Sequence, residues 1–163
     1  MKNIKIISLI MIFILCALGL GGCAESGNSA AANADESASV SDFKYPKKSA
    51  FKFEVSESKV TAKKGDVIKI NCVLKNTSKN DYHIEHGSET ITYSYNDESE
   101  VITALAVLDD FKSNSEIQRG LEITADKSGE IIVYAEISVK PSRFSEEMKT
   151  YNFEKKIKVT VTE

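Results

Sequence analysis

The chain has 163 residues, of which 42% are apolar and 28% are charged, a composition typical of one globular domain with appendages rather than of a disordered protein. Without Lys2 and Lys5 near the amino terminus, 19 basic residues stand against 24 acidic residues, a formal charge of −5. This acidity disfavours nucleic-acid binding, and because 19 of the 21 basic residues are lysines, bidentate recognition of phosphate or carboxylate by arginine is not expected.

The first 22 residues have the pattern of a secretory signal. A positive head, Met1–Lys5, precedes the apolar run Ile6–Leu18, which is shorter than the ~20 residues that a membrane-spanning helix needs. Small residues then lead to Cys23. Residues 1–22 are therefore predicted to be a cleaved export signal.

The end of this segment, Leu20-Gly21-Gly22-Cys23, resembles the lipobox of bacterial lipoproteins. The resemblance implies that Cys23 receives a diacylglyceryl thioether and becomes the first residue of the mature protein, held to the membrane by acyl chains such as palmitate. Two chains hold a protein durably, at ~0.8 kcal/mol per buried CH₂. Cys16 is a poorer candidate because the bulky Leu15 precedes it. The alternative is an ordinary signal peptide in which Cys23 is coincidental.

The residue after the cysteine is Ala24 rather than aspartate. In a bacterium with two membranes, this resembles a lipoprotein sorted to the outer membrane. In a bacterium with one membrane, it leaves the domain on the extracytoplasmic face of the cell membrane, and the sequence leaves both possibilities open.

Residues 24–42 are rich in alanine, serine and asparagine, with Val40 as the one larger apolar side chain. Such a segment buries too little surface to order itself, so residues 23–42 are predicted to be the lipidated cysteine and a disordered linker. A flexible chain of this length spans roughly 25 Å, enough to hold a domain clear of the lipid headgroups.

From Phe43 onward, apolar residues recur at every second position, the spacing of strands with one buried face. This alternation predicts strands over six stretches, Phe51–Val55, Ile68–Leu74, Ile91–Tyr95, Leu121–Ala125, Ile131–Val139 and Tyr151–Val161. Turn-forming residues separate these stretches at 63–66, 76–81, 96–100 and 126–129. The segment Val101–Leu108 is compatible with a strand or a short helix. Residues 43–163 are therefore predicted to form an all-β domain, an antiparallel β-sandwich of about seven to eight strands.

The segment Gly65–Ser78 resembles the second-strand region of bacterial immunoglobulin-like domains, in which a Gly-Asp turn leads into an alternating strand that ends in Leu-x-Asn-Thr-Ser. Lys155–Thr162 resembles their closing strand. Such domains occur in adhesive modules, transporter accessory domains and proteinase-inhibitor-type (BsuPI-like) proteins. The resemblance implies an immunoglobulin-like sandwich, although Cys72 is the single cysteine of the domain and the chain has no tryptophan.

Two histidines, His83 and His86, could suggest a copper or zinc site together with Cys72 and Met148. On a strand, however, residues three apart point to opposite faces. Copper sites also gather their cysteine, histidine and methionine ligands closely on a loop. Cys72 alternates with apolar neighbours, as a small buried side chain does. No metal or other cofactor is therefore expected, and a metal-binding lipoprotein is kept as an alternative.

Catalysis by a nucleophile needs a serine or cysteine beside a histidine that a carboxylate orients. The chain has no Gly-x-Ser-x-Gly sequence. The paired acids Asp109-Asp110 and Glu146-Glu147 are interpreted as hydrated surface. Asn96–Glu100 lacks the spacing of a calcium loop and is interpreted as a hydrated turn. The protein is predicted not to be an enzyme.

Aromatic and imidazole side chains concentrate in two neighbouring predicted strands, at Tyr82, His83, His86, Tyr93 and Tyr95. Tyrosines are frequent in interfaces because the ring offers contact area and a polar tip. These five residues are the candidate partner-binding residues. The alternative is that Tyr93 and Tyr95 line the core with Ile91.

These features predict a noncatalytic cell-envelope lipoprotein. Its immunoglobulin-like domain would bind an envelope protein or polymer, while the lipid on Cys23 holds it to the membrane. A proteinase-inhibitor-type domain is the alternative besides metal binding. Neither the ligand nor the oligomeric state follows from the sequence.

Overall fold

The computed structural model describes residues 42–102 and 105–163 of the chain. The predicted export signal, Cys23 and the predicted linker up to residue 41 lie outside these residues. Within the described ranges, no helix combines the length and apolarity needed to cross a membrane.

Strands make up most of the domain, and the one helical segment among the assigned elements is a short 3₁₀ turn at Lys48–Ala50. The strands are β1 (Phe51–Val55), β2 (Lys59–Lys63), β3 (Val67–Asn76), β4 (Tyr82–Gly87), β5 (Ile91–Tyr95), β6 (Glu98–Ser99), β7 (Ala106–Phe111), β8 (Glu116–Thr124), β9 (Gly129–Lys140) and β10 (Lys149–Thr162).

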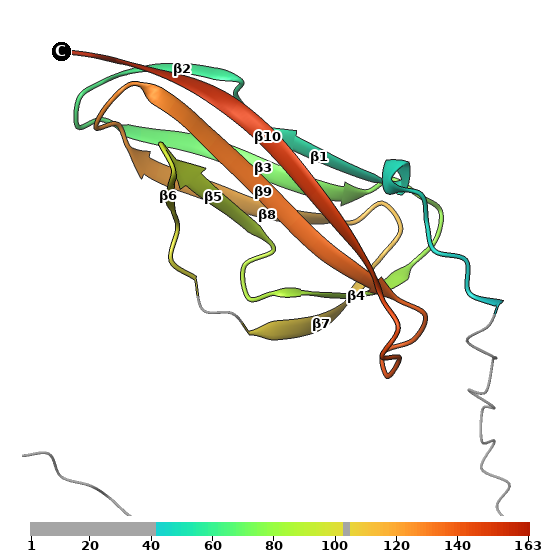
Figure 1. Ribbon diagram of the computed structural model, residues 1–163. Helices are drawn as coiled ribbons and strands as arrows, with labels where there is room; N and C mark the ends of the chain where they lie inside the picture. Colours follow the sequence, from blue (N-terminus) through green and yellow to red (C-terminus); the bar gives the residue numbers. More distant parts are fainter. Residues whose placement is uncertain (1–41, 103–104) are drawn as a thin grey trace, which may run out of the picture. The chain divides into compact units, whose positions relative to one another are not determined.

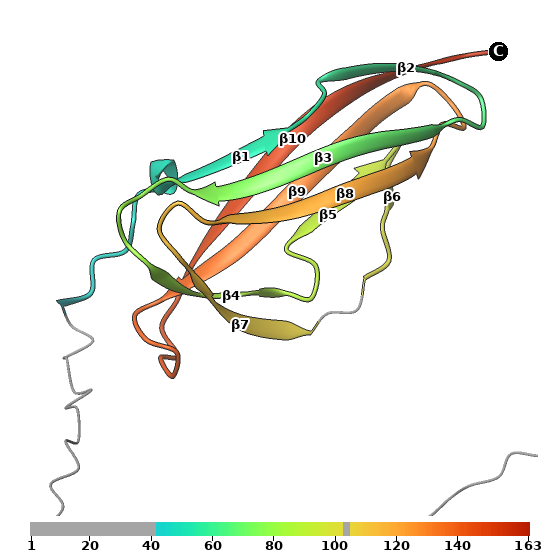
Figure 2. The same ribbon diagram turned by 180° about the vertical axis from the view of Figure 1, so that it is seen from behind.

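Two sheets pack face to face in a β-sandwich (Figures 1 and 2). The smaller sheet has the order β1-β3-β8, and Figure 2 shows it in front of β9 and β10. The larger sheet has the order β2-β10-β9-β4-β7, and β5 extends it along β9, with β6 paired to β5. Side chains of alternating positions fill the space between the sheets, among them the fully buried Ile70, Leu74, Ile137 and Ile157.

The strand order is that of an immunoglobulin-like sandwich, with β1, β3 and β8 in one sheet and β4, β9 and β10 at the centre of the other. The predicted fold class is thereby confirmed, with one correction. Strand β2 pairs in parallel with β10, from Lys59 opposite Lys158 to Lys63 opposite Thr162, so the sandwich is not antiparallel throughout.

The number of strands exceeds the predicted seven or eight because two strands of the sandwich are interrupted. Strands β4 and β5 follow one another along β9. In the same way, β6 pairs with β5 and β7 pairs with β4. The segment whose conformation was open, Val101–Leu108, contributes the start of β7 from Ala106 and is not helical at its described positions.

The cysteine of the domain lies in the core, as its alternation predicted. Cys72 on β3 is completely buried, and burial raises the pKa of its thiol to about 11, although the charge of Arg119 acts in the opposite direction. A thiol with that pKa is protonated at neutral pH and reacts slowly with electrophiles.

Iodoacetamide should therefore modify Cys72 in the folded protein at pH 8 at least ~100-fold more slowly than in denaturant, since two pKa units alone reduce the thiolate fraction ~100-fold. Mass analysis of the peptide that carries Cys72, sampled over time, measures this ratio. Equal rates in the two conditions would show that the thiol is not buried.

Candidate functional site

A hollow lies on the outer face of the larger sheet, where β4 gives way to β5. From Glu85 to Ile91 the chain advances six residues, while the partner strand β9 advances only three, from Ser138 to Ala135. The extra residues interrupt the strand in the manner of a large bulge. The segment 87–90 therefore leaves the regular pairing and becomes one wall of the hollow.

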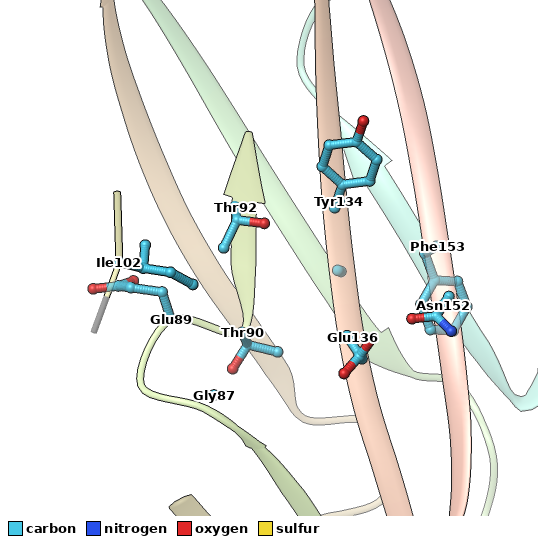
Figure 3. A pocket seen from close by; sticks show the side chains of 10 residues that line it. Gly87, Glu89, Thr90, Thr92, Ile102, Tyr134, Glu136, Asn152 and Phe153 are labelled. Atoms are coloured by element: carbon cyan, nitrogen blue, oxygen red, sulfur yellow. The ribbon is translucent and has the colours of Figure 1, made fainter. Parts of the chain in front are cut away.

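The floor of the hollow comes from three neighbouring strands (Figure 3). Thr92 on β5 is the registered partner of Tyr134 on β9, and Asn152 on β10 is the partner of Glu136 on β9. Partnered residues share a face of a sheet, so these four side chains lie together on the outer side. With Ile102 and the 87–90 wall, they enclose a volume of about 340 Å³.

The polar groups of the floor have no partners of their own within the described chain. The side chains of Thr92, Tyr134, Glu136 and Asn152 form no hydrogen bond or ion pair with residues 42–102 or 105–163. Tyr134 is 37% exposed, so part of its ring is open to solvent. The hollow thus offers an aromatic ring and free donors and acceptors to a ligand.

One arginine from the opposite sheet supports the wall. Arg119 on β8 binds both carboxylate oxygens of Glu100, with Nη1 2.8 Å from Oε2 and Nη2 2.6 Å from Oε1. Its Nη1 also donates to the Ile91 carbonyl at 2.5 Å, and Nε lies 3.3 Å from Glu89 Oε2. Arg119 therefore joins Glu89, Ile91 and Glu100 to the smaller sheet.

The two histidines occupy separate structural positions. His86 Nδ1 lies 2.6 Å from the Gly87 carbonyl oxygen and 2.9 Å from Thr90 Oγ1. Because a carbonyl oxygen only accepts, this geometry places a proton on Nδ1, so the ring cannot take a proton from Thr90 through that atom. His83 Nδ1 lies 2.8 Å from Asp110 Oδ1 on β7. Both rings therefore stabilise local structure.

The predicted aromatic surface is not gathered on one exposed face. Tyr82 is 8% exposed and packs edge-on against Phe51, with 5.5 Å between the ring centroids. Tyr93 and Tyr95 pack against the core, which is the alternative stated above. Tyr82 therefore offers little area to a partner, and a binding role for the histidines and the other two tyrosines stays a prediction. Sequence reasoning missed Tyr134, whose position between Val133 and Ala135 on β9 already placed it on the outer face.

The residues considered for copper or zinc are not brought together. Cys72 is enclosed in the core and Met148 is 47% exposed just before β10. Among residues 42–102 and 105–163, no group of three or more histidine, cysteine, aspartate or glutamate side chains is arranged to hold a metal ion.

A charged network lies on the β4–β7 pair, at the end away from Gly87. Asp110 is its centre, with Oδ2 2.8 Å from Arg143 Nη2 and Oδ1 2.8 Å from His83. The hydrogen bond from Arg143, followed by that from His83, lowers the pKa of Asp110 to about 2. Arg143 lies between β9 and β10, so the network holds that connection against β7.

The stability of the folded protein should depend on the ionisation of Asp110. Because the folded-state pKa of Asp110 lies below its ordinary value of 3.8, the carboxylate contributes its full stabilisation above about pH 4. This stabilisation is lost as the pH falls toward about 2. The difference in Tm between the unmodified protein and Asp110→Asn should therefore shrink over this range. Asp126→Asn removes an exposed carboxylate that forms no ion pair with the described residues and is the control. A difference that stays constant down to pH 2 would contradict the assignment.

Comparisons with known proteins identify no family. No family matches the sequence, and no curated protein matches it. Among solved structures, the ASH/PapD-like domain of human CEP192 (PapD-like domain 7) is similar over 75% of this chain and 93% of that chain, with a TM-score of 0.37 and 14% identity. A beta-glucosidase from Listeria innocua is similar over 68% of this chain and 16% of that chain, with a TM-score of 0.29 and 12% identity. These TM-scores are low, and the assignment of the fold rests on the strand order and pairing described above.

Proposed function

We propose that this protein is a noncatalytic, lipid-anchored binding module of a bacterial cell envelope. The lipid on Cys23 would hold it to the membrane, residues 24–42 would act as the linker, and the immunoglobulin-like sandwich would bind an envelope component through the hollow on its larger sheet. The lipobox-like sequence at 20–23 supports the location.

The observation that carries the binding role is the set of unpartnered side chains around Tyr134. Here an exposed aromatic ring, one amide, one carboxylate and the hydroxyls of Thr92 and Tyr134 line a single concave site, which is the pattern of small binding sites in proteins.

Photocrosslinking on intact cells tests this role. A benzophenone amino acid replaces Thr92 on the floor of the hollow or, as the matched control, Glu122 on the outer face of the smaller sheet. Glu122 is an exposed strand residue on β8, so both positions present the probe from a sheet surface. We expect a discrete adduct from position 92 and none from position 122. Equal adducts from both positions, or no adduct from position 92, would refute the hollow as the binding surface.

A further inference from the structure

We infer that the hollow binds a neutral sugar ring of a glycan, stacked against Tyr134; this inference rests on the proposed binding role and specifies its ligand. The chemistry of the lining excludes other classes of ligand in turn.

The charge of the lining disfavours anionic ligands. The charged residues that line the hollow are Glu89 and Glu136, and no lysine or arginine lines it. Glu89 is paired with Arg119, whereas Glu136 has no partner among the described residues. A phosphate or carboxylate group entering this site would face an uncompensated negative charge, which costs affinity. A ligand rich in hydroxyl or amide donors would instead satisfy the Glu136 carboxylate.

The hydrogen-bonding groups suit a polyhydroxylated ligand. Glu136 only accepts, while the Asn152 amide and the hydroxyls of Thr92 and Tyr134 can both donate and accept. A sugar hydroxyl also does both, so each of its hydroxyls can find a partner on this floor. The C–H face of a pyranose ring is apolar and can cover the exposed part of the Tyr134 ring, while Ile102 at the wall offers an apolar contact for an acetyl group.

The position of the hollow disfavours an extended peptide. Peptides that add to a sheet need a strand edge with free backbone groups. The floor strand β9 is paired with β10 on one side and with β4 and β5 on the other, so β9 has no free backbone edge. A ligand over β9 must therefore bind through side chains. A volume of about 340 Å³ is at the lower end of small-molecule sites, which suits one or two sugar rings.

Ligand-observed NMR titration of the purified full-length protein in detergent tests the inference. The probes are chitotriose, which is neutral and N-acetylated, and trigalacturonate, which is anionic. We expect chitotriose to bind with a Kd of about 0.1–1 mM and trigalacturonate to bind at least ~10-fold more weakly. Tyr134→Ala should weaken chitotriose binding at least ~10-fold, and Asn152→Ala, at an exposed position, should weaken it severalfold without disturbing the fold.

Phe144→Ala is the matched control, because Phe144 is an 88% exposed aromatic residue that does not line the hollow, and its removal should leave binding unchanged. The inference is overturned if chitotriose does not bind at about 10 mM, if Tyr134→Ala and Asn152→Ala bind it normally, or if trigalacturonate binds more tightly. If position 92 still forms its adduct on cells in such a case, the sugar assignment fails while the binding role stands. If position 92 forms no adduct and no glycan binds, both fail.

Discussion

Replacing Asn76 with aspartate is expected to lower the free energy of unfolding by about 3–5 kcal/mol. Asn76 ends β3, is completely buried, and its amide donates to the carbonyl oxygens of Asn80 at 2.8 Å, Phe111 at 3.0 Å and Lys112 at 3.1 Å. A carboxylate at this position would face three carbonyl oxygens without a proton to donate. Denaturant unfolding at neutral pH measures the loss.

The same variant should regain part of its stability as the pH falls toward about 4, because a protonated carboxyl can again donate one hydrogen bond. Asn71→Asp is the matched control, since Asn71 is on the same strand with an exposed side chain, and its free energy of unfolding should change by less than about 0.5 kcal/mol. A loss below about 1 kcal/mol for Asn76→Asp would show that the buried amide does not hold the β3–β4 connection, at Asn80, to the β7–β8 connection, at Lys112.

The second large effect is expected for Arg119→Met, which keeps the aliphatic stem and removes the guanidinium. The side chains of Arg119 and Glu100 are 22% and 19% exposed, so the pair is better shielded from water than most surface ion pairs. The substitution leaves the Glu100 carboxylate without its partner and should lower the free energy of unfolding by about 2 kcal/mol. Thermal and denaturant unfolding give this value.

A double variant distinguishes the loss of the Arg119–Glu100 ion pair from a general loss of packing around Arg119. Arg119→Met with Glu100→Gln should be more stable than Arg119→Met alone, because the Glu100 carboxylate is then no longer left unpaired, while Glu89, which also loses Arg119, is 47% exposed and hydrated. Lys69→Met is the control on the same sheet; its ion pair with Glu122 has side chains 75% and 67% exposed and should contribute less than about 1 kcal/mol. Equal losses in the free energy of unfolding for Arg119→Met and Lys69→Met would show that the Arg119–Glu100 pair stabilises the fold no more than an exposed ion pair does.

The strands of the sandwich could be predicted because burial on one face imposes a period of two. Five of the six predicted stretches fall within a strand of the structure, and the sixth, Leu121–Ala125, runs one residue past the end of β8 at Thr124. The predicted turn at 96–100 is in fact tighter. Asn96 and Asp97 alone form it, with positive φ angles of 50° and 68°, and the chain returns at once in β6. Asparagine and aspartate tolerate this conformation well, which makes the hairpin possible.

The Leu-x-Asn-Thr-Ser sequence, which supported the resemblance to immunoglobulin-like domains, has a physical explanation in the structure. The Oδ1 atom of Asn76 accepts from the Ser78 amide at 3.0 Å and from the Ser78 hydroxyl at 2.8 Å, while its two N–H groups face the three carbonyl oxygens given above. The Thr77 hydroxyl donates to the Ala50 carbonyl at 3.0 Å. This short sequence therefore fastens the end of β3 to the start of β1 and to the connection between β7 and β8.

The hollow could not be predicted from the sequence, because it arises from a difference in the number of residues between paired strands. Nothing local in Gly87–Thr90 shows that β9 would pair on both sides of it. The parallel pairing of β2 with β10 is also set by the whole sandwich rather than by either strand. Tyr93 and Tyr95, by contrast, lie two and four residues after Ile91 on the same strand, so they share its inward-facing side. This alternation could be seen in the sequence.

The proposed anchoring at Cys23 is tested by the intact mass of the protein isolated from the cells that naturally produce it. We expect the mass of residues 23–163 increased by a diacylglyceryl group on Cys23, with the preceding 22 residues removed. A Cys23 without acyl chains, or an amino terminus at another residue, would contradict the lipid anchor and the envelope role that depends on it.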